Sequence, residues 1–348
     1  MFACFILKEN NKGMYMKLLI LGANGFIGSH LCEAILAKKN WTIAALDLFS
    51  DKVSHCLSHP RFEFYQGDMT ASSDWLTFQF KNCDVVLPLA AIATPALYVK
   101  KPLLVFELDF EANLSIIRQC VQWRKRVIFP STSEVYGMCK DAVFDEEKSF
   151  CVTGPIHKER WIYANIKQLL DRIIYAYGKD QQLNYSLFRP FNWYGPKLDS
   201  LTNPHARVVT RFIGNILRQE EIVLVNGGEQ QRCFTYIDDG ITALLKIIEN
   251  KNNIAHNQIF NIGNPAENVS IKQLAKLLVE IMKDYPGYEN LTANKTIKIL
   301  SADNYYGEGY EDIDRRIPAI HRAQKYLNWQ PDIDLMTGLK KTVKAYLV

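Results

Sequence analysis

The chain has 348 residues, 48% of them hydrophobic, and its 41 basic and 37 acidic side chains give a formal net charge of +4. This size and composition predict a globular protein with a full hydrophobic core. The charges form no long run of one sign, which excludes the electrostatic signature of a nucleic-acid-binding or membrane-surface protein, and no stretch of about 18 apolar residues predicts a membrane span. A small anionic ligand is compatible with this charge.

Eight cysteines are scattered along the chain without a C-x-x-C pair or histidines at metal-ligand spacing. They predict neither a metal site nor a disulfide framework, and they favour a reducing, cytoplasmic location. Residues 1–15 contain too short an apolar segment for a secretory signal. They are expected to form a disordered leader, with Met14 or Met16 as the natural start.

From residue 16 to residue 193, short apolar runs alternate with segments of helical periodicity. This alternation is typical of the α/β class and predicts a Rossmann domain, with a doubly wound parallel sheet. The expected strands are residues 17–23, 41–47, 62–68, 83–91, 126–130 and 184–195, and the expected helices are residues 28–39, 104–124 and 163–178.

After residue 193 the periodicity changes. Residues 194–348 are expected to form mainly a smaller C-terminal substrate lobe, whose segments interleave with the first domain and partly return to it. Helices are expected at 206–219 and 270–283. Residues 284–312, with several glycines and tyrosines, are expected to be an irregular surface or site-covering segment.

A glycine pattern follows the first expected strand directly. Gly22, Gly25 and Gly28 form G-x-x-G-x-x-G at the start of a helix, where glycines permit a tight turn and the close approach of a pyrophosphate to the helix N-terminus. Asp47 ends the second strand 19 residues beyond Gly28, the position of a carboxylate that accepts hydrogen bonds from a ribose. The pattern predicts an NAD-binding domain at 16–193, because an acidic residue repels the 2′-phosphate of NADP. Asp68 could reach the adenine or cap a helix.

Tyr163 and Lys167 are four residues apart in an expected helix and therefore share one face. A lysine ammonium close to a phenol favours the phenolate. The positive nicotinamide of NAD would add to this effect, so the two cations together predict a tyrosine pKa lowered from about 10 towards neutrality. Such a tyrosine can take a proton from a sugar hydroxyl as hydride leaves. Y-x-x-x-K alone is a common pattern, and the preceding glycine motif favours its catalytic interpretation.

The segment FPSTSEVYGM, residues 129–138, places three hydroxyl residues and Glu134 at the end of a buried strand, the edge at which parallel sheets hold ligands. Thr132 is predicted to hold the hydroxyl that Tyr163 deprotonates. Ser133 and Glu134 are then available for a second chemical step, because a simple dehydrogenase or epimerase needs only the threonine, tyrosine and lysine. The alternative is that these residues cap the chain after the strand.

These motifs make the chain resemble the extended short-chain dehydrogenase/reductase (NAD-dependent epimerase/dehydratase) family. Within it, the chain is similar to the UDP-glucuronate-decarboxylating domains of the bifunctional polymyxin-resistance proteins of the ArnA type. The resemblance covers nearly all of residues 16–347. It is carried by GANGFIG, CDVVLPLAAIATP, VFELDFEANL, FPSTSEVYG, RWIYANIKQLLDR, FRPFNWYGP, GGEQQRCFT, NIGNP and YYGEGYEDIDRRIP.

The resemblance implies three groups of site residues. Catalytic roles are implied for Thr132, Ser133, Glu134, Tyr163, Lys167 and Arg316, the last acting near the sugar carboxylate. Contacts with the UDP-sugar are implied for Arg160, Asn192, Arg232 and Tyr310. Residues expected to contact NAD are Gly22, Asn24, Gly25, Phe26, Ile27, Gly28, Asp47, Asp68, Met69 and Ala90.

The activity implied is NAD-dependent oxidative decarboxylation of UDP-glucuronate to UDP-4-ketopentose, carbon dioxide and NADH, in a homodimer. Sugar-nucleotide 4,6-dehydratases have an aspartate where this chain has Ser133, which argues against dehydration. UDP-apiose/UDP-xylose synthases have a cysteine there, which disfavours that activity. Two alternatives stay open: a UDP-xylose synthase, in which NADH reduces the ketone again, and a non-catalytic NAD-binding protein. The pathway is also open, with lipid A modification by aminoarabinose as one candidate.

Overall fold

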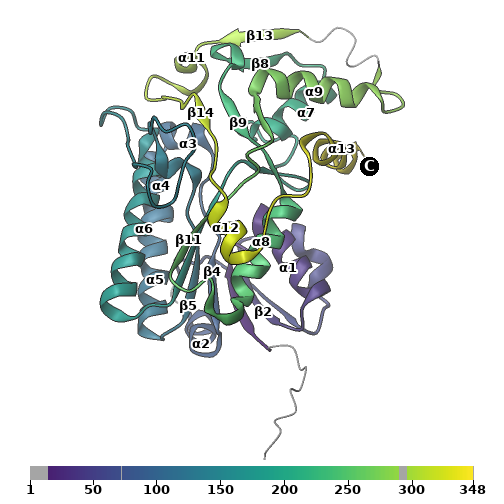
Figure 1. Ribbon diagram of the computed structural model, residues 1–348. Helices are drawn as coiled ribbons and strands as arrows, with labels where there is room; N and C mark the ends of the chain where they lie inside the picture. The colour runs from purple at the N-terminus through teal and green to yellow at the C-terminus, as the bar shows by residue number, and fades with distance from the viewer. Residues whose placement is uncertain (1–14, 72, 290–295, 348) are drawn as a thin grey trace, which may run out of the picture.

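The computed structural model describes residues 15–71, 73–289 and 296–347. All but the last residue of the expected leader, 1–15, lies outside this part of the chain. An α/β layer forms one part of the molecule and a smaller lobe packs against the end of its sheet (Figure 1). In the described part of the chain, no helix is both long enough and apolar enough to cross a membrane.

The α/β layer is built on one parallel sheet of seven strands in the order β11-β6-β5-β4-β1-β2-β3. This confirms the predicted doubly wound Rossmann fold. The order reverses between β1 and β4, which creates the crevice in which such sheets hold ligands. The strands are β1 (Lys17–Leu21), β2 (Thr42–Asp47), β3 (Phe62–Gln66), β4 (Val85–Pro88), β5 (Arg126–Pro130), β6 (Tyr185–Pro190) and β11 (Gln258–Ile262).

Helices cover both faces of this sheet, because successive side chains of each buried strand point to opposite sides. In β1, Leu18 and Ile20 pack in the cluster that contains α1 and α8, whereas Leu19 and Leu21 pack in the cluster that contains α2, α5 and α6. The helices of the layer are α1 (Phe26–Lys38), α2 (Asp74–Asn82), α3 (Pro95–Lys100), α4 (Pro102–Phe106), α5 (Asn113–Gln122), α6 (Trp161–Gln181), α8 (Ile237–Glu249) and α12 (His321–Leu327).

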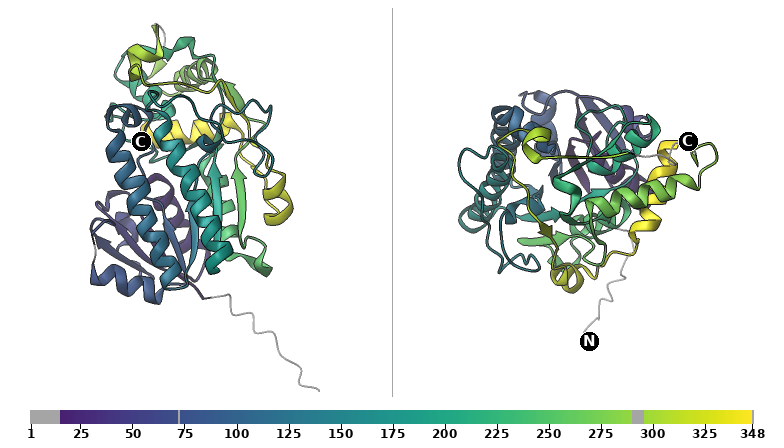
Figure 2. Two further views of the ribbon diagram at one scale, coloured as in Figure 1. Left: turned by 90° about the vertical axis from the view of Figure 1, so that its left-hand side faces the viewer. Right: turned by 90° about the horizontal axis from the view of Figure 1, so that it is seen from above.

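The smaller lobe contains short strands and three longer helices, and the left view of Figure 2 shows it above the Rossmann layer. Its segments come from beyond residue 193, but α8 and β11 from the same stretch return to the Rossmann layer. The other elements are β7 (Trp193–Tyr194), α7 (Val208–Leu217), β8 (Ile222–Val225), β9 (Gln231–Cys233), β10 (Thr235–Tyr236), β12 (Asn268–Ser270), α9 (Ile271–Lys283), β13 (Ile297–Leu300), α11 (Ala302–Tyr306), β14 (Arg315–Arg316) and α13 (Leu335–Leu347).

Several elements differ from the sequence-based expectations. The helix expected at 104–124 is interrupted by a π-helical stretch, Glu107–Ala112, which turns Asp109 into the core. The segment 284–312 contains β13 and α11, although it was expected to be irregular, because β13 pairs with β8 at its edge. Helix α2 was not predicted, since its sequence DWLTFQFKN has only a weak apolar face.

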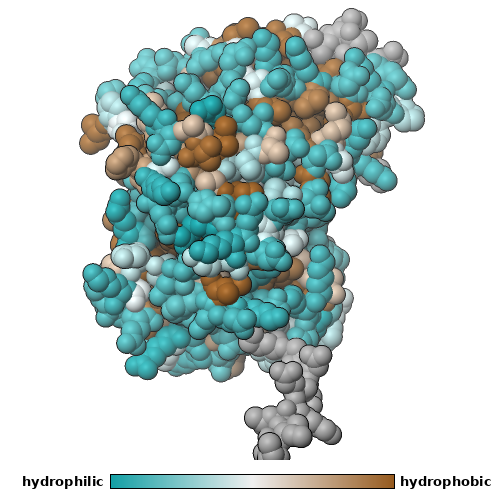
Figure 3. Space-filling model, viewed as in Figure 1, coloured by the Kyte–Doolittle hydropathy of each residue, from teal (hydrophilic) through white to brown (hydrophobic). Residues whose placement is uncertain are grey.

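The surface also differs between the two parts. In the face drawn in Figure 3, hydrophilic side chains cover most of the Rossmann layer, and hydrophobic side chains gather over the smaller lobe. The core is nevertheless continuous, because one buried cluster joins Leu31 of α1 and Leu244 of α8 to Phe212 of α7 and Leu278 of α9. The lobe is therefore packed onto the Rossmann layer through hydrophobic side chains.

Candidate active site

The glycine turn lies between β1 and α1, where the sequence places it. Gly22 has φ of +89°, and a Cβ there would stand 2.5 Å from the backbone nitrogen of Ala90. A Cβ at Gly28 would stand 2.3 Å from the carbonyl oxygen of Gly22. Both positions therefore require glycine, one for its dihedral angle and both for close backbone packing.

Asp47 ends β2 beside this turn. Its carboxylate accepts hydrogen bonds from the backbone amides of Asn24, at 2.8 Å, and Leu48, at 2.7 Å. Burial raises the pKa of Asp47, and these hydrogen bonds oppose the rise. The side chain of Asn24 is used structurally, since it donates to Asp51 at 2.7 Å and accepts from the amide of Lys52 at 2.7 Å.

A cavity of about 470 Å³ extends from the glycine turn to the end of β5. Eight of the predicted cofactor residues line it: Gly22, Asn24, Gly25, Phe26, Ile27, Gly28, Asp47 and Ala90. The glycine turn and the carboxylate of Asp47 at the end of β2 fit a dinucleotide. Among the described residues, Asp68 and Met69 stand outside this lining; Asp68 caps a turn by accepting from the amide of Thr70 at 2.8 Å, and Met69 is buried.

The reacting groups lie at the other end of the same cavity. Thr132 precedes a 3-10 turn, Ser133–Tyr136, and caps it by accepting from the amide of Glu134 at 3.2 Å. Thr132 is also hydrogen-bonded to Tyr163 of α6. One turn further along α6, Lys167 donates to the carbonyl of Pro130 at 3.0 Å and lies 5.9 Å from the centre of the Tyr163 ring.

The protein's own groups raise the pKa of Tyr163. Burial raises it, and the negative charges of Asp109 and Glu134 raise it further, whereas the hydrogen bond with Thr132 and the charge of Arg207 lower it. Lys167 is not among the main groups that act on Tyr163, and burial lowers the pKa of this lysine. The positive charge of the nicotinamide of bound NAD would lower the pKa of Tyr163, because it stabilises the phenolate.

Glu134 lies between two arginines. Its carboxylate is 2.8 Å from Arg160 and 3.4 Å from Arg316, and all three side chains are buried. Burial raises the pKa of Glu134, but the two cations outweigh this effect and hold it below its ordinary value. Burial and the neighbouring Arg232 lower the pKa of Arg316 to about 10. Glu134 is therefore an anion, and Arg316 a cation, at neutral pH.

A second cavity, of about 430 Å³, opens towards the smaller lobe. Arg232 on β9 and Arg316 on β14 are partners in adjacent parallel strands, and both line it. Asp312 offsets this concentration of positive charge by accepting from Arg232 at 2.6 Å. Tyr310 also lines the cavity and stacks on Tyr306, with ring centres 4.0 Å apart.

The two cavities meet, because six residues line both: Ala93, Glu134, Asn192, Trp193, Arg207 and Arg316. Of these two cavities, Ser133 lines the nucleotide cavity alone. Arg160 lines neither of them, because it is buried behind Glu134. Asn192 has φ of +42° and donates to the carbonyl of Cys233 at 3.0 Å.

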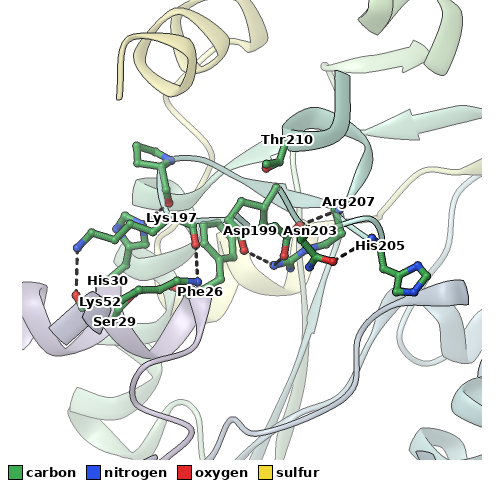
Figure 4. A network of polar contacts seen from close by, with 12 residues as sticks. Phe26, Ser29, His30, Lys52, Lys197, Asp199, Asn203, His205, Arg207 and Thr210 are labelled. Atoms are coloured by element: carbon green, nitrogen blue, oxygen red, sulfur yellow. Dashed lines mark hydrogen bonds and ion pairs between the residues drawn. The ribbon is translucent and has the colours of Figure 1, made fainter. Parts of the chain in front are cut away.

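Three charged residues of this region were not singled out from the sequence. Asp109 accepts from the amide of Ile92 at 3.0 Å in the core, Asp312 pairs with Arg232, and Arg207 pairs with Asp199 (Figure 4). Asp109 and Asp312 contact distant segments, whereas Arg207 pairs with Asp199 only eight residues away, and none of these contacts follows a recognised sequence motif.

One acidic group stands apart from both cavities. Asp145, Glu146 and His321 are close enough for one ligand atom of each to face a common point. The Asp145 carboxylate already accepts from the amides of Glu147, at 2.9 Å, and Lys148, at 3.0 Å. These hydrogen bonds give Asp145 a structural role in stabilising the loop that follows it.

The family model of the NAD dependent epimerase/dehydratase family matches residues 18–263, more than half of the chain. The chain belongs to this family. Its cofactor is accordingly NAD, as predicted, and the protein is an NAD-dependent enzyme of this family. The predicted superfamily is confirmed at this level.

Solved structures of related chains agree with this family. The PbgP3 protein from Burkholderia pseudomallei is 47% identical, with a TM-score of 0.87 and 96% of each chain covered. UDP-glucose 4-epimerase from Thermotoga maritima, solved with UDP-glucose, is 25% identical, with a TM-score of 0.78 over 95% of this chain and 99% of that one. UDP-glucuronic acid 4-epimerase from Bacillus cereus, solved with UDP-glucuronic acid and NAD, is 23% identical, with a TM-score of 0.79 over 95% and 98%, and supports the fold alone.

Proposed function

We propose that this epimerase/dehydratase-family enzyme oxidatively decarboxylates UDP-glucuronate, giving UDP-4-ketopentose, carbon dioxide and NADH. One observation carries the proposal. The buried cation Arg316, paired with Glu134, faces both the nucleotide cavity and the second cavity, beside the Thr132–Tyr163 pair. A sugar whose carbon 4 reaches Tyr163 would place the carboxylate on its carbon 5 near this cation.

The first step needs a base and a hydride acceptor. Tyr163 would take the proton of the sugar's 4-hydroxyl, while Thr132, hydrogen-bonded to Tyr163, orients that hydroxyl. NAD, when bound, accepts the hydride from carbon 4. Lys167 stiffens the site by tying α6 to the end of β5 through its bond to Pro130.

The second step follows from the first. The new ketone at carbon 4 is β to the carboxylate, so the electron pair of the bond to the carboxyl carbon can move into an enolate as carbon dioxide leaves. Arg316 would bind the carboxylate and stabilise the negative charge as it moves towards the carbon 4 oxygen. A proton from water then returns to carbon 5, and Tyr163 releases to water the proton that it took from the 4-hydroxyl, so that the protons balance. Glu134 is held as an anion by its arginines, so its role is to fix Arg316 rather than to deliver that proton.

The second cavity has the chemistry for the nucleotide part of the substrate. Arg232 supplies a cation for a diphosphate, and the stacked Tyr306 and Tyr310 supply flat apolar surface. Asn192 adds an amide at the junction of the cavities. Arg160 reaches the substrate only through Glu134 in this arrangement, so we assign it a positioning role.

The product would be a keto sugar suited to a later amino-transfer reaction. We therefore propose a place on a route to an amino-pentose such as the aminoarabinose that modifies lipid A. We also propose that the enzyme acts as a homodimer.

The direct test is to mix the purified protein with UDP-glucuronate and NAD, to follow NADH absorbance, and to identify the sugar nucleotide by mass spectrometry. NADH rising with a product lighter by carbon dioxide and two hydrogens is the expected result. UDP-xylose formed without net NADH would contradict the proposal, because it would show that NADH reduces the ketone again before release. No consumption of UDP-glucuronate would refute it.

A further inference from the structure

Arg207 occupies an unusual position between the two lobes. It directly precedes α7 of the smaller lobe, yet it lines both the nucleotide cavity and the second cavity. Its guanidinium is held by a two-point contact with Asp199, at 3.1 Å through Nε and 3.0 Å through Nη2, and Nη2 also donates to the carbonyl of Leu198 at 2.7 Å (Figure 4). The side chain is therefore fixed before any ligand is present.

The loop that holds Arg207 is itself braced by the C-terminal helix. The hydroxyl of Tyr346 in α13 donates to the carbonyl of Asp199 at 2.9 Å and lies 3.2 Å from the hydroxyl of Thr210 in α7. The position of Arg207 is thus a property of the whole smaller lobe.

The guanidinium faces the glycine turn of the opposite lobe. Its carbon lies 5.3 Å from the centre of the Phe26 ring, and Phe26 is the first residue of α1, directly after Gly25. The N-terminus of a helix after such a turn is where the pyrophosphate of a dinucleotide binds. Arg207 therefore stands across the cavity from the expected pyrophosphate position.

The other cations of the nucleotide cavity are engaged elsewhere. Lys167 donates to the carbonyl of Pro130, and Arg316 pairs with Glu134. Within the described chain, the Nη1 nitrogen of Arg207 has no hydrogen-bond partner, and the side chain is 35% exposed. Its charge also reaches the reacting end, where it lowers the pKa of Tyr163.

We propose that Arg207 is a diphosphate-binding residue that holds the pyrophosphate of NAD from the side opposite the glycine turn. Because Arg207 belongs to the smaller lobe, NAD then contacts both lobes and stiffens the wall of the second cavity. The same chemistry would suit the diphosphate of a nucleotide sugar, and the position above Phe26 favours NAD.

The test is a binding measurement that needs no turnover. Calorimetric titration of Arg207→Gln with NAD should show an affinity lower by roughly ten- to a hundredfold, the range for losing a charge-assisted hydrogen bond. ADP-ribose, which keeps the pyrophosphate and lacks the nicotinamide, should lose the same factor. UDP should bind as it does to the unchanged protein. Arg218→Gln removes the same charge from the far end of α7 and should leave all three affinities unchanged.

Two further variants separate charge from position. Asp199→Asn keeps the Arg207 charge but weakens its two-point anchor, so NAD affinity should fall by less than in Arg207→Gln. Arg207→Lys should recover part of the affinity, and this part should shrink as salt is raised. Melting curves of each variant without ligand report whether the fold is intact.

The binding results for Arg207→Gln either support the proposal or overturn it. Equal loss of NAD and ADP-ribose binding in Arg207→Gln, with UDP unaffected, supports the proposal. Loss confined to UDP would move Arg207 to the nucleotide-sugar diphosphate and overturn the assignment. Loss of NAD but not of ADP-ribose would place its action at the nicotinamide end and would overturn it as well. These measurements involve no sugar oxidation, so they stand whether or not UDP-glucuronate is the substrate.

Discussion

Tyr163 lies in an environment that keeps its phenol protonated until a ligand changes the charge around it. It is stacked on Tyr98 with ring centres 4.6 Å apart, and burial raises its pKa. The charge of Arg207 and the hydrogen bond with Thr132 are the opposing influences within the protein. Ionisation of this residue is therefore coupled to occupancy of the nucleotide cavity.

Replacing Tyr163 by Phe keeps the stacked ring and removes the base. We expect hydride transfer to fall by roughly a hundredfold or more, the usual contribution of a positioned acid or base, with NAD affinity unchanged. Tyr175→Phe changes an exposed tyrosine of the same helix and should turn over normally. Stopped-flow NADH formation measures the rate, and a Tyr163→Phe rate within about tenfold of the parent would remove Tyr163 from the mechanism.

Asp109 is a second residue whose ionisation has a measurable consequence. Burial raises its pKa from 3.8 to about 6, so the folded protein binds the proton more tightly than the unfolded chain does. Stability should therefore fall as pH rises from about 4 to about 6, by an amount on the order of 3 kcal/mol from this group.

The variant Asp109→Asn cannot ionise and should lose this part of the pH dependence. Urea unfolding at several pH values within the window checks it. Asp180→Asn, at an exposed position near the end of α6, should keep the parent's slope. An unchanged slope in Asp109→Asn would contradict the raised pKa.

Local spacing identified residues that share one element, and the family resemblance identified residues such as Arg316 whose partners lie far away in the chain. Tyr163 and Lys167 share a helix face, and the hydroxyl cluster follows a buried strand, so spacing alone predicted both features. Asp312 was missed because its partner Arg232 lies 80 residues away, and Arg207 because its place between the two cavities depends on how the two lobes pack. The effect of burial on the pKa of Tyr163 is likewise a property of the folded chain, and the lowering expected with bound NAD stays a prediction.

At the scale of elements, the β1–α1 turn depends most strictly on backbone shape. Gly22 has a positive φ, and the backbone of Leu89 and Ala90 leaves no room for a Cβ at this position. The strain of the dihedral angle alone costs roughly 1–2 kcal/mol. Gly22→Ala should therefore lower the free energy of unfolding by more than this amount, and it should abolish NAD binding.

Gly227→Ala is the matched control for this change. Gly227 has φ of +80°, but a Cβ there would have nothing within 4 Å. Gly227→Ala should therefore lower the free energy of unfolding only by the dihedral cost of about 1 kcal/mol, and it should leave the NAD affinity unchanged. Chemical denaturation and calorimetry measure both variants, and equal losses in the two would show that crowding at Gly22 is unimportant.

Elements with strong periodicity and caps were predictable, and elements stabilised by pairing were not. The Rossmann strands are continuous apolar runs, and α9 begins with a capping box between Ser270 and Gln273. Strand β13 is mostly exposed and exists because it pairs with β8, which no local pattern reports. The π-helical stretch before α5 likewise depends on turning Asp109 towards Ile92.

For the whole molecule, exposed apolar side chains on one flank bear on the expected homodimer. Phe106, Leu169 and the fully exposed Ile156 line a cavity of about 360 Å³ beside α6, which Figure 2 shows running next to α5. Such a flank is suited to burial against a second copy.

Leu169→Glu should therefore shift the protein from dimer to monomer in sedimentation velocity, because it places a charge in the apolar flank. Ile299→Glu, at an exposed position of β13 in the smaller lobe, should leave the dimer intact. A parent protein that sediments as a monomer at all concentrations would contradict the homodimer.

The central claim is that oxidation at carbon 4 makes the loss of carbon dioxide possible and that NADH leaves with the product. The measurement that tests it most directly follows carbon dioxide, from UDP-glucuronate labelled at the carboxyl carbon, and NADH in the same reaction. We expect equal amounts of carbon dioxide and NADH, formed over the same time course and both lost in Tyr163→Phe. Carbon dioxide without accumulating NADH, or NADH without carbon dioxide, would contradict it.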